Sequence, residues 1–182
     1  MRVMMMLLAI PLIAGCSQVR TYQPPADPNT LDSTQFVHYL ARVPVVNYAE
    51  TCRAMVILLD EDDAASDQAG REALLSDRGV VRAAWHIPPD HVVDMGTLAF
   101  MLSKACDLPP TAGTVVFGSW GLGDRRYAHR QVVSEGLMEY APVYKPVAGG
   151  DLVLALSRAD DYIAKKSGGL DVREPDSPGD LD

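Results

Sequence analysis

Residues 79–105 read GVVRAAWHIPPDHVVDMGTLAFMLSKA, and residues 136–159 read GLMEYAPVYKPVAGGDLVLALSRA. The two stretches align with a gap of three residues in the loop. The residues that then match are Gly79 with Gly136, Val93 with Val147, Gly96 with Gly150, Leu98 with Leu152, Leu102 with Leu156, Ser103 with Ser157 and Ala105 with Ala159. A glycine is typical of a left-handed helix end, and leucines four residues apart mark one helical face. The repeat therefore predicts two copies of one unit, in which a helix ends at a glycine and a loop leads to a second helix.

A fainter third copy precedes these two. In that copy the places of Val147, Asp151 and Leu156 are taken by Val46, Glu50 and Met55. One helix pair cannot bury its apolar face alone, whereas three pairs packed together can. We therefore expect a mainly α fold of three helix-loop-helix units around one core. In this fold Leu102 and Leu156 occupy equivalent core positions, and the nearly all-apolar stretch 48–59 forms a central helix.

The repeat resembles the S-layer homology (SLH) domain. Units of that family read as a helix, Gly-Ile or Gly-Leu-Met, a loop, and a Thr-Arg-Ala-Glu start to a second helix. The best match is 127–162, where Tyr127 falls on the family's aromatic residue and Asp151 on its glutamate. Glu50 and Thr97 take the acidic place in the other copies, and the arginine is absent from all three. The resemblance implies three units over residues 33–166 and attachment to anionic cell-wall polymers.

The N-terminal residues 1–15 read MRVMMMLLAIPLIAG, with one positive charge followed by about thirteen apolar residues, too few for a mature membrane-spanning helix. Ile13-Ala14-Gly15-Cys16 follows and resembles the lipobox of bacterial lipoproteins. The resemblance implies a signal peptide over 1–15, cleavage before Cys16 and lipid attachment to its thiol. Ser17 is not the aspartate associated with inner-membrane retention, so the outer membrane, on its periplasmic face, is favoured. An ordinary signal peptide and an uncleaved anchor are the alternatives.

Composition outlines the rest of the chain. Hydrophobic residues make up 48% of the 182 residues and charged residues 22%, as in ordinary globular domains. The 16 basic and 24 acidic residues give a net charge of −8, the wrong sign for a nucleic-acid-binding protein.

Proline-rich residues 16–30 predict an extended tether, and residues 167–182, rich in Gly, Pro and acidic residues, predict a disordered tail. The folded domain is therefore expected over 31–166, with a minor β element at the β-branched stretch 114–117.

Two further cysteines are relevant in an exported chain. Cys52 and Cys106 form an even pair once Cys16 carries lipid, so a disulfide between them is one alternative. Both lie in apolar helical patterns, where buried free thiols are the more frequent state. The free state is therefore favoured.

The strongest candidate for a ligand surface is the cluster of arginines after the glycines of 118–123. It consists of Trp120, Arg125, Arg126, Tyr127 and Arg130. Arginines at the start of a helix collect anions through their charge and the free N–H groups. The alternative, which we favour from the sequence, is that these arginines pair with the acidic runs 61–63 or 160–161.

Catalytic and metal-binding patterns are weak. Ser119 lacks the strand-turn-helix elbow of a serine hydrolase, and the loop with His86, Asp90, His91 and Asp94 has no tight zinc spacing. No catalytic residue, metal or cofactor is therefore assigned.

We expect a non-enzymatic cell-envelope lipoprotein that binds a cell-wall polymer or an envelope protein. The alternatives are an exported hydrolase acting on cell-wall material and an adaptor subunit of an envelope complex.

Overall fold

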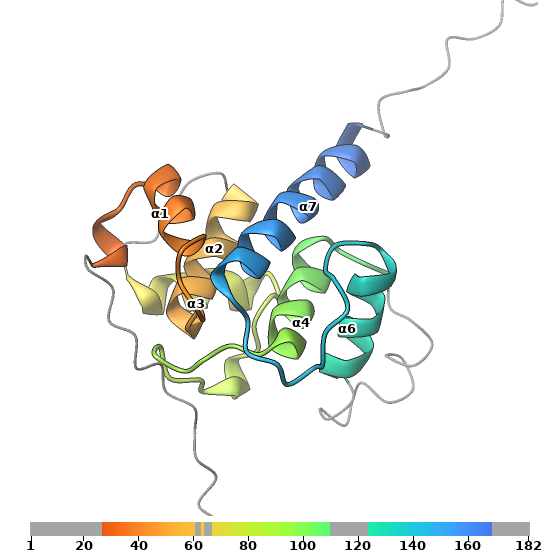
Figure 1. Cartoon of the computed structure of the whole chain (residues 1–182), viewed down its shortest axis with the longest axis horizontal. Helices are drawn as coiled ribbons and strands as arrows, with labels where there is room; N and C mark the ends of the chain where they lie inside the picture. Colours follow the sequence, from red (N-terminus) through yellow and green to blue (C-terminus); the bar gives the residue numbers. More distant parts are fainter. Residues whose placement is uncertain (1–26, 61–62, 64–66, 110–123, 169–182) are drawn as a thin grey trace, which may run out of the picture.

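The computed structural model describes residues 27–60, 63, 67–109 and 124–168 (Figure 1). Its helices are α1 (Ser33–Leu40), α2 (Tyr48–Asp60), α3 (Gln68–Asp77), α4 (Met95–Ala105), α6 (Asp124–Ser134) and α7 (Gly149–Gly168), with 3-10 turns at η1 (Pro28–Thr30) and η2 (Ala83–Trp85). No strand occurs among the described residues. The predicted mainly α fold is confirmed, whereas the β element expected at 114–117 lies outside the described residues.

The helices form two groups, with α7 between them. Figure 1 shows α1, α2 and α3 together on one side and α4 beside α6 on the other, and α2 also contacts α4. The first part of α7 packs on α1 and α2, and its C-terminal part extends beyond the rest of the domain. Each second helix of the aligned stretches, α2, α4 and α7, thus begins near the middle of the molecule.

Three buried valines join these helix starts. The backbone N–H of Val46 donates to the carbonyl of Val147 (3.0 Å), that of Val147 to Val93 (2.9 Å), and that of Val93 to Val46 (3.2 Å). These bonds close a ring in which each segment donates to one neighbour and accepts from the other. Isolated β-bridges flank the ring, Asn47 with Val92 and Asp94 with Pro146. We call Val46, Val93 and Val147 the valine ring.

The first N–H groups of an α-helix have no hydrogen-bond partner within the helix. In α2, α4 and α7, backbone carbonyl groups of a neighbouring segment accept these hydrogen bonds. The bonds run from Tyr48 to His91 (2.8 Å), from Met95 to Lys145 (3.0 Å), from Gly149 to Val43 (3.0 Å), from Ala49 to Pro89 (2.9 Å) and from Gly96 to Val143 (2.8 Å). His91 and Lys145 both lie two residues before a valine of the ring. The segment before α7 therefore meets α4 in the same way as the segment before α4 meets α2.

Gly79 and Gly136 end the helices α3 and α6. Their φ angles are +70° and +74°, a conformation that costs other residues about 1–2 kcal/mol. The bonds that close each end run from Val80 to Leu75 (2.8 Å) and from Leu137 to Val132 (3.0 Å), a Schellman pattern whose two apolar side chains are buried. The expectation of left-handed glycines at both positions is confirmed.

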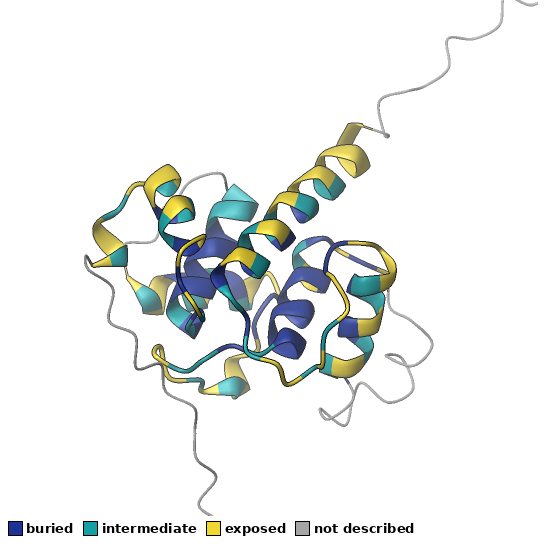
Figure 2. Cartoon of the chain, in the orientation of Figure 1, coloured by how far each residue is buried: buried dark blue, intermediate teal, exposed yellow. Residues whose placement is uncertain are grey.

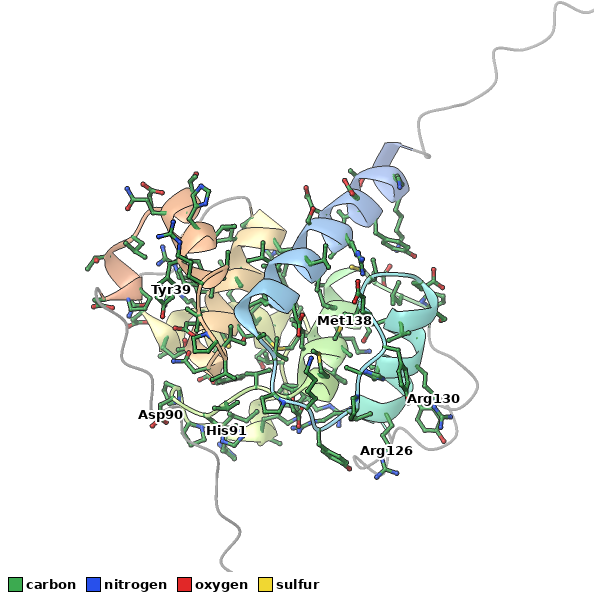
Figure 3. The ribbon with its side chains drawn as sticks, viewed as in Figure 1. Tyr39, Asp90, His91, Arg126, Arg130 and Met138 are labelled. Carbon is green, nitrogen blue, oxygen red and sulfur yellow. The ribbon has the colours of Figure 1, made fainter. Side chains whose placement is uncertain are left out.

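Polar side chains close two of the helix starts near the ring. Asn47 accepts from the N–H of Glu50 (2.8 Å), and Glu50 accepts in return from the N–H of Asn47 (3.0 Å), a reciprocal capping box. The hydroxyl of Tyr39, which lies on α1 and is labelled in Figure 3, also donates to Glu50 (2.5 Å). Asp94 accepts from the N–H of Thr97 (2.7 Å) at the start of α4. In the two copies Glu50 and Thr97 thus occupy the third position of the helix, as the alignment expects.

The core is centred on α2 and α4, which are buried on almost every side (Figure 2). Leu98, Met101 and Leu102 of α4 and Leu152 of α7 are fully buried. Leu156 is only partly buried, because it borders an open groove between α7 and the pair α1 and α2. The expectation that Leu102 and Leu156 are equivalent core positions is therefore wrong.

Candidate functional site

The helix α6 carries the arginines singled out from the sequence. Its first residue, Asp124, is buried and forms an ion pair with Arg82, on the loop before η2. Ala128 and Val132 face the interior, and α6 packs against α4. Arg126 and Arg130, four residues apart, are exposed and project outward from α6 (Figure 3). Packing of the inner face thus fixes the direction of the two outer arginines.

Arg125 lies against an aromatic pair rather than a carboxylate. Its guanidinium carbon is 4.9 Å from the ring centroid of Trp85, and Trp85 lies 5.1 Å from the ring of Phe100. The charged groups of Arg82 and Lys104 lie 5.0 Å and 5.8 Å from the same Phe100 ring. Cations within about 6 Å of a ring face are attracted by its quadrupole. Two aromatic rings therefore hold three cations close together, and one of them, Arg82, also pairs with the carboxylate of Asp124.

Arg126 contacts Tyr144, on the segment before α7. Its guanidinium donates to the phenol oxygen (3.0 Å) and lies 5.9 Å from the ring centroid. The hydrogen bond with Tyr144 raises the pKa of Arg126, so the guanidinium stays charged. We define the basic–aromatic surface as Arg82, Trp85, Lys104, Arg125, Arg126, Arg130 and Tyr144.

The expected pairing of Arg125, Arg126 and Arg130 with the acidic runs 61–63 or 160–161 is tested only in part, because residues 61 and 62 lie outside the described residues. Within the described residues, Arg125 contacts Trp85 and Arg126 contacts Tyr144. Within the first acidic run, the side chain of Asp63 is 7% exposed and pairs with Arg53 (2.8 Å) and Arg71 (2.6 Å). None of the ion pairs between described residues involves Arg125, Arg126 or Arg130.

The predicted site residues are partly brought together. Arg125, Arg126, Tyr127 and Arg130 share α6, with Tyr127 half-buried, while Trp120 and Cys16 lie outside the described residues. Four residues of the surface were missed from the sequence: Arg82, Trp85, Lys104 and Tyr144. Their proximity to α6 comes from the packing of α6 on α4 and has no local signal in the sequence.

The cysteines and the buried histidine do not form a reactive site. Cys52 and Cys106 are buried free thiols, so the disulfide alternative is wrong. Burial raises the pKa of Cys52 to about 12 and that of Cys106 to about 11, so neither is a thiolate at neutral pH. Burial also lowers the pKa of His129, and its Nε2 has no hydrogen-bond partner among the described residues.

The histidine loop adjoins the basic–aromatic surface at one end, because His86 follows Trp85 and borders a pocket with Arg82. Figure 3 places Asp90 and His91 on the segment before α4, on the other side of the view from Arg126 and Arg130. No group of three metal-ligating side chains occurs among the residues that the structure describes.

Comparison with family models, curated proteins and solved structures yields no match. Within the described ranges, no helix has the length and hydropathy needed to cross a bilayer. The function must therefore be argued from the residues themselves.

Proposed function

We propose that this chain is a non-enzymatic, lipid-anchored protein of the cell envelope that binds an anionic cell-wall polymer at the basic–aromatic surface. The observation that carries the proposal is the gathering of Arg82, Arg125, Arg126 and Arg130 with two exposed or half-exposed rings in a chain of net charge −8. The one carboxylate in contact with these residues, among those described, is the buried Asp124. The surface thus suits a ligand with regularly spaced negative charges.

Three SLH-like units form the scaffold in this proposal. Support comes from the closed hydrogen bonds of the valine ring, whose members are the three aligned valines, and from the positive φ of Gly79 and Gly136. The family's arginine position is occupied by Tyr48, Met95 and Gly149, so an anion site there lacks its bidentate donor. In this proposal the arginines of α6 supply that donor instead.

Each part of the surface has a distinct role in binding. Arg126 and Arg130 lie one helical turn apart, about 6 Å, which suits successive anionic groups of an extended polymer. The exposed ring of Tyr144 offers apolar contact to the sugar rings between those groups. Contacts to exposed charges are screened by salt, so binding is expected to weaken as ionic strength rises.

Removal of the two outer charges tests this function. The Arg126→Gln/Arg130→Gln double variant should bind dextran sulfate and isolated cell-wall polymer about tenfold more weakly, since two exposed ion contacts contribute roughly 1.4 kcal/mol together. Isothermal titration of the mature chain without its lipid measures the affinity. The charge-matched control is Arg42→Gln/Lys165→Gln, two exposed positions outside the surface, which should keep the wild-type affinity. If both double variants lost the same affinity for the polyanion, the loss would reflect the lower net charge of the whole protein rather than the basic–aromatic surface. That result would contradict the proposal.

Lipid attachment has its own test. In the membrane fraction, the wild-type chain should carry the mass of a diacylglyceryl and an acyl group on Cys16, and Cys16→Ala should remain unprocessed and unmodified. Intact mass spectrometry distinguishes the two. A wild-type protein with an unmodified Cys16 thiol would contradict the anchor, without affecting the polymer-binding surface.

A further inference from the structure

The fourteen residues that follow α7 are strongly acidic. Residues 169–182 read GLDVREPDSPGDLD, with five carboxylates and a single basic residue, Arg173, so their net charge is −4. They lie outside the described part of the chain. We call residues 169–182 the acidic segment. Its carboxylates belong to Asp171, Glu174, Asp176, Asp180 and Asp182.

The basic–aromatic surface has the opposite charge. It carries four arginines and Lys104, and the one carboxylate that contacts them among the described residues is that of Asp124. Arg126 and Arg130 are exposed and project outward from α6 (Figure 3). Neither takes part in an ion pair between described residues. The surface and the acidic segment of the same chain are therefore complementary in charge.

Two contacts connect the start of the acidic segment to α6 by way of the end of α4. Near the end of α7, the ammonium of Lys166 donates to the carbonyl of Asp107 (3.0 Å) and to its carboxylate (2.9 Å). Two residues further on, the carbonyl of Pro109 accepts from the side-chain amide of Gln131 (2.6 Å), which follows Arg130 on α6. Fourteen residues extend to about 45 Å, longer than the roughly 30 Å of α7 itself. The acidic segment is therefore long enough to reach the arginines of α6.

The spacing of the carboxylates also matches that of the outer arginines. Arg126 and Arg130 lie one helical turn apart, about 6 Å. Carboxylates two positions apart in an extended chain are about 7 Å from each other and point the same way. The acidic segment contains two such pairs, Glu174 with Asp176 and Asp180 with Asp182. Pro175 favours an extended backbone in the residue before it, which suits the first pair.

We propose that the acidic segment docks on the basic–aromatic surface of its own chain and competes there with anionic polymers. Each exposed ion pair contributes little. The tether holds the acidic segment at an effective concentration on the order of 1 mM, so a few weak contacts are enough to populate the docked state. Polymers with a higher density of negative charge displace the segment. The competition rests on the proposed polymer binding, whereas the docking does not.

A spin label on the acidic segment tests docking without any polymer. Ser177→Cys supplies a thiol for a nitroxide in the mature chain without its lipid, while Cys52 and Cys106 stay unlabelled because they are buried. The nitroxide should lower the amide NMR signals of residues 125–130 at least twofold relative to the reduced label. The effect should disappear in Arg126→Gln/Arg130→Gln and in about 0.5 M NaCl, where surface charges are screened.

A mixed sample separates docking within one chain from docking between chains. A ¹⁵N-labelled chain without the nitroxide is mixed with a spin-labelled chain of natural isotope content, and the signals of α6 should keep their intensity. Unchanged α6 signals in the spin-labelled chain itself, a loss of signal that persists in Arg126→Gln/Arg130→Gln, or an equal loss in the mixed sample would each overturn the proposal.

Competition is measured by titration with dextran sulfate. A variant that neutralises four carboxylates of the acidic segment should bind at least fivefold more tightly than the wild type, because no charged segment has to leave the surface. Its substitutions are Asp171→Asn, Glu174→Gln, Asp176→Asn and Asp180→Asn. The matched control removes four charges from exposed positions of the folded domain and should gain less than twofold: Asp77→Asn, Asp90→Asn, Asp160→Asn and Asp161→Asn.

The two experiments separate this proposal from the proposed function. Equal gains in the segment variant and in the control would reflect the net charge of the whole protein and would overturn the competition. If neither the wild type nor the segment variant bound dextran sulfate, the proposed polymer binding would be contradicted instead. The spin-label experiment would then still decide whether the acidic segment docks on the arginines of α6.

Discussion

Replacing Gly149 by alanine is expected to destabilise the domain by about 3 kcal/mol or more. A Cβ atom at this position would lie 1.8 Å from the carbonyl oxygen of Leu40 and 2.8 Å from that of Val43. These are backbone atoms at the end of α1, so a side-chain rotation cannot relieve the contact. The start of α7 would have to move away from α1, and the bond from the N–H of Gly149 to Val43 would break with it.

The adjacent glycine provides the control. A Cβ atom at Gly150 would meet nothing within 4 Å, and alanine favours a helix over glycine by roughly 0.5–1 kcal/mol. Gly150→Ala should therefore leave stability unchanged or raise it slightly. Urea unfolding followed by circular dichroism measures both variants. Similar stability of Gly149→Ala and the wild type would show that α7 does not start against the end of α1.

Asp63→Asn should cost about 3–5 kcal/mol, because it removes the carboxylate charge that pairs with two buried arginines. Asp63 is 7% exposed and accepts from Arg71 through both oxygens (3.1 Å and 2.6 Å), while Arg53 lies 2.8 Å away. Arg53 also donates to the carbonyls of Pro28 and Leu31. The cluster thus connects η1 to α2 and α3 by hydrogen bonds. η1 lies within residues 16–30, which the sequence predicts to be an extended tether.

Asp60→Asn is the matched control for this variant. Asp60 pairs with Arg78 at 2.6 Å, but its side chain is partly exposed and that of Arg78 is exposed, so its loss should cost less than about 1 kcal/mol. Urea unfolding again gives the free energies. Equal costs for the two aspartates would contradict the buried arrangement of Asp63.

Much of the fold was predictable because it depends on local signals. Gly79 and Gly136 mark helix ends by their conformational freedom, and the apolar stretch 48–59 lies almost wholly within the buried α2. The burial of Asp63 was not predictable, since its partners Arg53 and Arg71 belong to two helices and a lone acidic run is usually a solvated turn. Aligned positions also differ in burial when their neighbours differ. Leu156 is only partly buried because it borders a groove, whereas the aligned Leu102 is fully buried.

The candidate site was predictable only in part for the same reason. Arg125, Arg126 and Arg130 stand together in the sequence, so their cluster could be read directly. Trp85, which contacts Arg125, lies 40 positions before it. That proximity depends on how η2 and α6 pack around α4, and no local pattern reports it.

Amide hydrogen exchange of the valine ring tests the three-unit arrangement most directly. The N–H groups of Val46, Val93 and Val147 are buried and bonded to one another in a closed cycle, so none can open alone. We expect all three to exchange only through global unfolding, with free energies that agree within about 0.5 kcal/mol and match the urea value. Fast exchange at one valine while the other two stay protected would contradict the ring and, with it, the proposed arrangement of three SLH-like units.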